Sequence, residues 1–118
     1  MSQQVALECL RIGTQWVTDR VQTLHQNREA VWNAVSQMPG TVKTTGGFYF
    51  LVKLPKGIQD MDAVRYLAKV WEVLVIPCTS CGVSGFLRVS YGNLPQEECS
   101  IASQRLKNGL AAILAGKL

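Results

Sequence analysis

The amino-acid sequence predicts an α+β fold: a two-layer sandwich with a small sheet of about four short strands and helices packed on one face. The prediction rests on the order of the segments, which read as helix, helix, strand, strand, helix, strand, strand, helix. It also rests on size, because 118 residues with 47% hydrophobic content make one domain that can bury its own core.

Two helices are predicted at the N-terminal end. The first covers residues 3–11, and Thr14 then begins a long helix that runs to about Gln37, because the Met-Pro-Gly that follows cannot continue it. The core positions of the long helix step by three and four residues: Val17, Val21, Leu24, Arg28, Val31 and Val35. Arg28 is the polar member, and we expect it to snorkel from the edge of this stripe.

Four short runs rich in branched and aromatic residues indicate the strands. Residues 41–45 (TVKTT) lead through two glycines into residues 48–55 (FYFLVKLP). After a predicted helix, residues 73–77 (VLVIP) indicate a short buried strand, and residues 85–91 (GFLRVSY) indicate the last one.

Two further helices complete the pattern. One is expected to start at Asp60 and to carry on one face Met61, Val64, Leu67, Ala68 and Trp71. The last follows Pro95, which suits a first helical position, and its apolar stripe is Cys99, Ala102, Leu106, Leu110 and Ile113.

Arg88 lies in the middle of an apolar strand and is the strongest sign of a binding function. Because side chains alternate along a strand, Arg88 faces away from Leu87 and Val89, which suit the core. Spacing alone allows two interpretations. Arg88 is either a solvated surface residue or an anion site, whose planar guanidinium grips a carboxylate through two parallel hydrogen bonds.

The composition argues against nucleic-acid and membrane partners. The 12 Lys and Arg residues exceed the 8 Asp and Glu residues, but they are scattered singly and form no basic block. No apolar run approaches the ~20 residues that span a bilayer, and residues 1–4 lack a signal-peptide pattern. We therefore expect a cytoplasmic protein with reduced cysteines.

Cys78 and Cys81 form a C-x-x-C motif, which raises the question of a metal or redox site. A zinc site needs further ligands, but the chain has one histidine and its other two cysteines are isolated. A thioredoxin-like motif opens a helix, whereas residues 82–85 (GVSG) indicate a loop. The sequence favours plain reduced thiols over a redox or metal role, and no metal ligand is predicted.

Four segments are specific in combination: HQNREAVWNAVSQMPG, GGFYFLVKLP, VLVIPCTSCG and GFLRVSYGNLPQEECSIASQRLKNGL. In this order and at these separations they resemble the C-terminal domain of class I/II aminotransferases, pyridoxal-phosphate enzymes of the aspartate aminotransferase type. The resemblance covers residues 1–118 and implies that they form this small domain. Residues 1–37 would include the long helix that leads out of a large domain absent from the chain.

The resemblance implies that Arg88 binds the α-carboxylate of the amino-acid substrate, and that Gly47 and Tyr49 belong to a turn lining the substrate side of the site. The family usually has glycine at the position of Cys78 and often an aromatic residue near Cys81, so changed packing is expected in that loop. The full-length enzyme would be a homodimer that transfers an amino group between an amino acid and a 2-oxo acid.

The same resemblance implies that the lysine and the phosphate-binding groups for pyridoxal 5′-phosphate lie on the large domain. None of the six lysines of this chain matches the lysine motif of the family. We therefore expect no catalytic residue, no stable cofactor binding and no activity in the isolated chain. The alternatives are a stand-alone binding or interaction module that kept the small-domain fold without catalysis, and a remnant.

Overall fold

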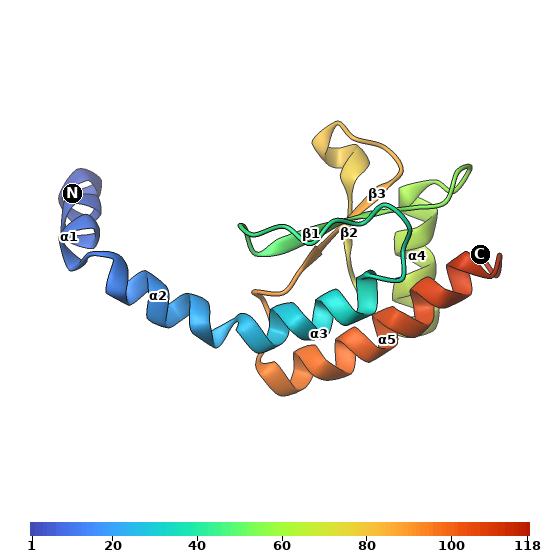
Figure 1. Cartoon of the computed structure of the whole chain (residues 1–118). Helices are drawn as coiled ribbons and strands as arrows, with labels where there is room; N and C mark the ends of the chain where they lie inside the picture. The colour runs from blue at the N-terminus through green and yellow to red at the C-terminus, as the bar shows by residue number, and fades with distance from the viewer.

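The computed structural model describes residues 1–118 and confirms the α+β class, with five α-helices, one 3₁₀ helix and three strands. In chain order they are α1 (Ser2–Ile12), α2 (Thr14–Thr23), α3 (His25–Val35), β1 (Tyr49–Lys53), α4 (Asp60–Trp71), β2 (Ile76–Pro77), the 3₁₀ helix η1 (Cys78–Cys81), β3 (Phe86–Ser90) and α5 (Gln96–Leu114). Helices α3 and α5 lie side by side beneath the sheet, and α4 packs on α5 (Figure 1). No helix combines the length and apolar character that crossing a lipid bilayer requires.

The three strands form an antiparallel sheet in the order β1-β3-β2, so β3 is the central strand. Alternate residues of β1 and β3 are buried, as expected when one sheet face packs on a core. The buried face consists of Phe50, Val52, Leu87 and Val89, and these side chains join those of α3, α4 and α5 in one apolar core. The opposite face of β3 is the one that carries Arg88.

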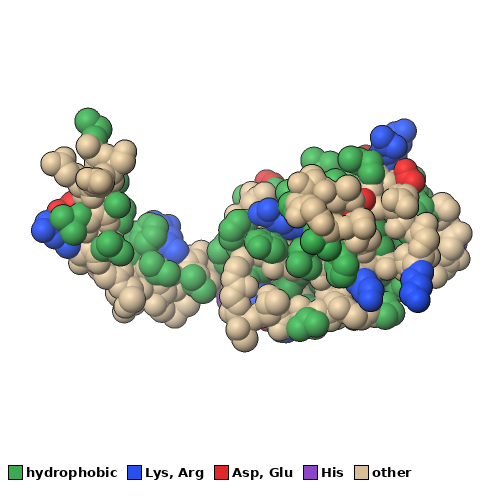
Figure 2. All heavy atoms as spheres, turned by 90° about the horizontal axis from the view of Figure 1, so that it is seen from above, with side chains coloured by type: hydrophobic (Ala, Val, Ile, Leu, Met, Phe, Trp, Pro, Cys, Tyr) green, Lys and Arg blue, Asp and Glu red, His purple; other side chains and the backbone are tan.

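The long N-terminal helix predicted up to about Gln37 is divided at Leu24 into α2 and α3. The Leu24 N–H bonds the carbonyl three residues back at 3.1 Å, a tightened turn that changes the helix direction. Helices α1 and α2 bury no residue and extend from the body as an arm (Figures 1 and 2). The prediction of Val17 and Val21 as core positions is therefore wrong, and only the α3 half of the stripe reaches the core.

Three of the four predicted strands form, and each is shorter than its apolar run. Residues 41–45 pair with no strand. Instead they contact α3, because Arg28 bonds the carbonyl of Thr44 and Lys43 bonds the carboxylate of Glu29. In the run before η1 only its last two residues pair with β3. Val73 and Val75 are buried but Leu74 and Ile76 are exposed, so the prediction of a buried strand holds for alternate residues only.

Candidate functional site

Arg88 lies at the centre of the sheet, on the face that the alternation of β3 predicts. Its cross-strand partners are Leu51 of β1 and Ile76 of β2. Leu87 and Val89 beside it are buried in the core, whereas Arg88 is half-buried. The backbone of Arg88 is therefore fixed in the central strand of the sheet. This fixed backbone limits the positions that the guanidinium can adopt.

Two aromatic rings pack on the guanidinium of Arg88. Its Cζ atom lies 4.4 Å from the ring centroid of Tyr49 and 5.8 Å from that of Phe48. These are cation–π distances, and the two contacts restrict the orientation of the guanidinium plane. The Nε atom of Arg88 is buried without a hydrogen-bond partner, and none of the five ion pairs of the chain includes Arg88. The side chain is therefore ordered by packing while its charge faces no carboxylate of the chain.

Hydrogen bonds to β3 and its extension hold the turn before β1. Tyr91 donates its hydroxyl proton to the carbonyl of Gly47 at 2.5 Å and its backbone N–H to the carbonyl of Phe48 at 3.0 Å. Gly47 has a φ of +79°, a left-handed conformation that disfavours side chains, so the turn depends on glycine here. The turn leads directly into Tyr49, which pairs with Ser90 across the sheet.

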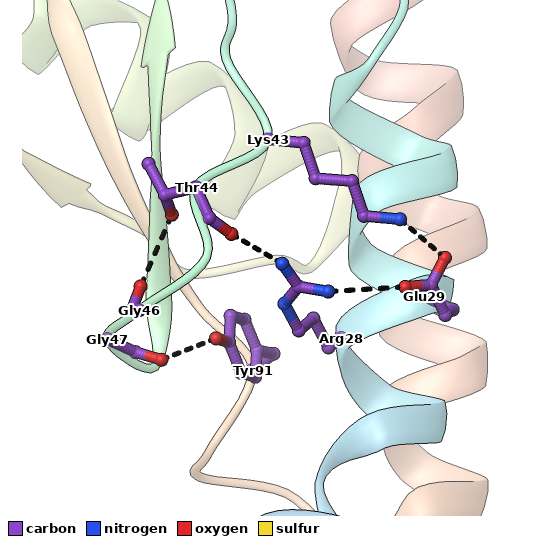
Figure 3. Close-up of polar contacts among 7 residues, drawn as sticks. All are labelled: Arg28, Glu29, Lys43, Thr44, Gly46, Gly47 and Tyr91. Carbon is purple, nitrogen blue, oxygen red and sulfur yellow. Dashed lines mark hydrogen bonds and ion pairs between the residues drawn. The ribbon is translucent and has the colours of Figure 1, made fainter.

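Arg28 of α3 ties down the segment that precedes this turn (Figure 3). Its guanidinium donates to the carbonyl of Thr44 and lies 3.4 Å from the carboxylate of Glu29. Lys43 bonds the same carboxylate at 2.8 Å, and this hydrogen bond holds the pKa of Glu29 below its ordinary value. Arg28, the polar member of the predicted core stripe, thus donates to a backbone carbonyl 16 residues away. This contact explains why Arg28 lies at the edge of the core.

Asn27, also on α3, stabilises the connection between β3 and α5. Its side chain is buried, and its Nδ2 atom donates to the carbonyls of Tyr91 at 3.3 Å and Leu94 at 2.9 Å. Backbone carbonyls in a connection have no strand or helix partner, so this amide satisfies two groups that would otherwise be costly to bury. The sequence analysis did not predict a role for Asn27. The sequence shows only that Asn27 is a polar residue next to Arg28, the polar member of the predicted core stripe.

The 3₁₀ helix η1 is fastened to the first residue of α4. The carboxylate of Asp60, which is buried, accepts hydrogen bonds from the Thr79 hydroxyl at 2.6 and 2.8 Å, from the Thr79 N–H at 2.7 Å and from the Met61 N–H at 3.0 Å. The hydroxyl of Thr79 first, and then its N–H, hold the pKa of Asp60 below its ordinary value. Asp60 therefore bonds across to η1 as well as to the start of its own helix.

Thr79→Val is expected to lower the urea midpoint of unfolding at neutral pH, with a difference from the wild type that shrinks in acid. Because the pKa of Asp60 is lowered by folding, the native state binds fewer protons than the unfolded state. The stabilisation is present above the unfolded-state pKa of about 3.9 and is lost as the pH falls through the lower native pKa. Urea curves at a series of pH values measure it. A difference that stays constant throughout the acid range would contradict the role of Asp60, and Ser80→Ala at the exposed neighbouring position serves as the control.

The structure brings two of the three predicted site residues into contact and connects the third through a neighbour. Tyr49 contacts Arg88, whereas Gly47 is linked to β3 through Tyr91. Gly47 and Tyr49 line an open hollow of about 500 Å³, with Leu51 and Thr44 among its other residues. Arg88 lines a different hollow of about 300 Å³ beside β2 and the start of α5.

Comparisons with known proteins show the family to which the chain belongs. The family described as "Aminotransferase class I and II" matches residues 1–106. Aromatic aminotransferase ISS1 of Arabidopsis thaliana is 38% identical over 118 residues, covering 97% of this chain and 30% of that protein. The chain therefore spans about a third of the length of this curated relative.

Solved structures share the fold. The aromatic aminotransferase from Pyrococcus horikoshii superposes with a TM-score of 0.71 at 25% identity, covering 82% of this chain and 27% of that one. The aspartate aminotransferase from Thermotoga maritima also gives a TM-score of 0.71, at 23% identity, covering 90% of this chain and 27% of that one. On the strength of the family match over most of its length, the chain belongs to the pyridoxal-phosphate-dependent aminotransferases of class I and II.

Proposed function

We propose that residues 1–118 are the C-terminal small domain of a longer aminotransferase and bind the α-carboxylate of its substrate through Arg88. The longer enzyme would transfer an amino group between an amino acid and a 2-oxo acid. The observation that carries this proposal is the half-buried guanidinium of Arg88, which is ordered by two rings and lacks an acidic partner in the chain. Homodimerisation and a cytoplasmic location stay predictions within it.

The fork of Arg88 suits a carboxylate in both charge and shape. Because Nε is buried, the two Nη atoms are the donors left to form parallel hydrogen bonds with the two carboxylate oxygens. Phe48 and Tyr49 already restrict the guanidinium, so less side-chain freedom is lost on binding. A substrate held in this way would present its α-carbon to the cofactor in one orientation, which is how positioning contributes to rate.

We further propose that the substrate carries an aromatic side chain. The support is the similarity to two proteins that are named as aromatic aminotransferases, one of them 38% identical over nearly the whole chain. The apolar residues Leu51 and Phe86, which line the hollow beside Gly47 and Tyr49, are compatible with such a side chain.

The residues of this chain do not fit pyridoxal 5′-phosphate on their own. When bound, this cofactor supplies an electron sink for the bonds at the α-carbon, and it needs an activated lysine and a phosphate cradle. All six lysines are exposed, without the desolvation that activates such a lysine. Helices α4 and α5 begin with acidic residues, which disfavour a phosphate at their N-termini. We therefore assign the groups that hold the cofactor to a part of the enzyme outside these residues.

Titration of the purified chain with pyridoxal 5′-phosphate, followed by borohydride reduction and peptide mapping, tests this assignment. The expected result is weak, scattered labelling of several exposed lysines that an added amino acid does not prevent. Stoichiometric labelling of one lysine, abolished by an amino acid, would mean that these residues contain a cofactor site. That outcome would instead favour an independent activity of the chain.

A further inference from the structure

The C-x-x-C motif forms the whole of η1, which brings its two cysteines onto one side of a turn. A 3₁₀ helix has three residues per turn, so side chains at positions i and i+3 are eclipsed. With a rise of ~2 Å per residue, the Cα atoms of Cys78 and Cys81 are separated by about 6 Å, within the range that a disulfide spans. The loop predicted at residues 82–85 follows this 3₁₀ turn, and the turn itself suits a sulfur–sulfur bond.

The two thiols differ in exposure. Cys78 is 3% exposed, whereas Cys81 is exposed, and both are free in the structure. The N–H of Val83 donates to the carbonyl of Cys78 at 3.0 Å, and the N–H of Gly82 donates to the carbonyl of Thr79 at 3.0 Å. These two backbone hydrogen bonds stabilise the turn. An exposed thiol beside a buried one is the arrangement in which the first can react with a reagent and the second can displace it.

The surroundings of η1 connect it to the candidate site. It packs against β3 and α4, and Thr79 within it bonds Asp60. Desolvation raises the pKa of Cys78, the nearby Cys81 and the carboxylate of Asp60 add to that rise, and the positive charge of Arg88 opposes it. Cys78 also follows β2 directly, and Ile76 of β2 pairs with Arg88, so η1 begins beside the strand position of the proposed carboxylate-binding arginine.

We propose that Cys78 and Cys81 form a reversible dithiol–disulfide couple at the margin of the Arg88 site, closed by exchange with a small disulfide such as oxidised glutathione. The proposal does not depend on the identity of the substrate. In a reducing compartment such couples are transient and serve redox sensing or catalysis rather than structure. The oxidation state of this couple would change the packing of η1 against β3, next to Arg88.

The reaction has two steps. The thiolate of Cys81 attacks one sulfur of oxidised glutathione, so a mixed disulfide forms and one glutathione thiolate leaves. The thiolate of Cys78 then attacks the sulfur of Cys81, forming the internal disulfide and releasing the second glutathione. Two electrons pass from the protein dithiol to the glutathione disulfide, and the two thiol protons end on the two reduced glutathione molecules. Because burial raises the pKa of Cys78, the second step is the slow one at neutral pH and accelerates as the pH rises.

Peptide mapping resolves this couple, because trypsin places the cysteines on separate peptides. Cys78 and Cys81 fall together on residues 70–88, whereas Cys9 and Cys99 fall on residues 1–11 and 89–105. The native chain is treated with oxidised glutathione over a range of pH, quenched in acid, alkylated and digested. The expected product is peptide 70–88 with two hydrogens fewer and no alkyl group, formed faster at higher pH, while Cys9 carries only glutathione.

Three variants separate the steps. Cys78→Ser is expected to stop at glutathione on Cys81, and Cys81→Ser is expected to leave Cys78 unreacted because it is buried. Cys9→Ser, a change in the exposed arm, leaves the couple unaffected. The proposal is overturned if the wild-type peptide 70–88 carries glutathione on Cys81 with an alkylated Cys78 at every pH, or if both cysteines are alkylated. Since Cys81 is exposed, its substitution tests the proposal even if that of Cys78 disturbs folding.

Discussion

Arg88→Lys is expected to lower the kcat/KM of the longer enzyme that contains this chain by about 10- to 100-fold. An ammonium offers no planar fork, so one of two parallel charge-assisted hydrogen bonds to the substrate carboxylate is lost. Such a bond is worth about 1.5–3 kcal/mol, and each 1.4 kcal/mol is a factor of about ten. Because the carboxylate is bound before and during the reaction, KM should rise and kcat should fall as the substrate becomes less well oriented.

Arg105→Lys is the matched control for that change. Arg105 lies on the exposed side of α5 and pairs with Glu72 at 3.0 Å, an exposed ion pair of the kind that contributes about 0–1 kcal/mol. Its replacement should leave the steady-state kinetics at the wild-type level. Equal kinetics for the Arg88→Lys and wild-type enzymes would contradict the assignment of Arg88 to the substrate carboxylate.

Gly109→Ala is expected to destabilise the chain by about 1–3 kcal/mol, the usual result of overpacking a core. A Cβ atom at position 109 would lie 2.5 Å from Cδ2 of Leu67 and 3.0 Å from Cδ1 of Trp71, both on α4. Alanine is a better helix former than glycine by about 1 kcal/mol, so an unhindered site would give the opposite sign. Urea unfolding monitored by circular dichroism measures the difference.

Ser100→Ala provides the comparison on the same helix, because Ser100 is exposed and its replacement should change stability by no more than about 0.5 kcal/mol. Glycine at position 109 lets α4 approach the backbone of α5 closely and bury Leu67 completely. If Gly109→Ala proved as stable as the wild type or more so, the packing of α4 on α5 would be looser than the structure shows.

The features that follow from local periodicity could be predicted from the sequence. The alternation of side chains along β3 predicts Leu87 and Val89 in the core and Arg88 on the other face. A shift of the strand register by one residue would exchange the faces of all three side chains, so the apolar pattern specifies the register. The stripe of α5 was predicted for the same reason, since a helix with one apolar face has one way to pack. The α+β class follows from the order of these elements.

The features that depend on distant partners could not be predicted. A continuous apolar stripe indicated one long helix, but nothing local shows that its first half lies on the arm, without a partner. Residues 41–45 have strand-forming composition, yet Arg28 and Lys43 attach them to α3. The contacts of Asn27 with the β3–α5 connection span more than 60 positions, beyond any local pattern.

For the site, the resemblance supplied the candidates and the structure supplies their arrangement. The sequence alone left Arg88 between a solvated residue and an anion site. Its stacking on Tyr49 and its lack of an acidic partner favour the second interpretation. The roles of Gly47, Tyr49 and Arg88 in binding substrate stay predictions.

Binding of a carboxylate by Arg88 is measured most directly through its Nε–H signal in the ¹⁵N spectrum of the labelled chain. Nε is buried, so its proton should exchange slowly enough to be seen, and Arg88→Lys identifies the signal by removing it. The probe is 3-phenylpropanoate, and the control is the neutral amide of the same shape. We expect the Nε–H signal to shift saturably with the carboxylate and not to shift with the amide. A Kd on the order of 1 mM is expected, which corresponds to a binding free energy of about −4 kcal/mol. Equal shifts with both compounds, or no shift of this signal while others move, would contradict carboxylate binding by Arg88.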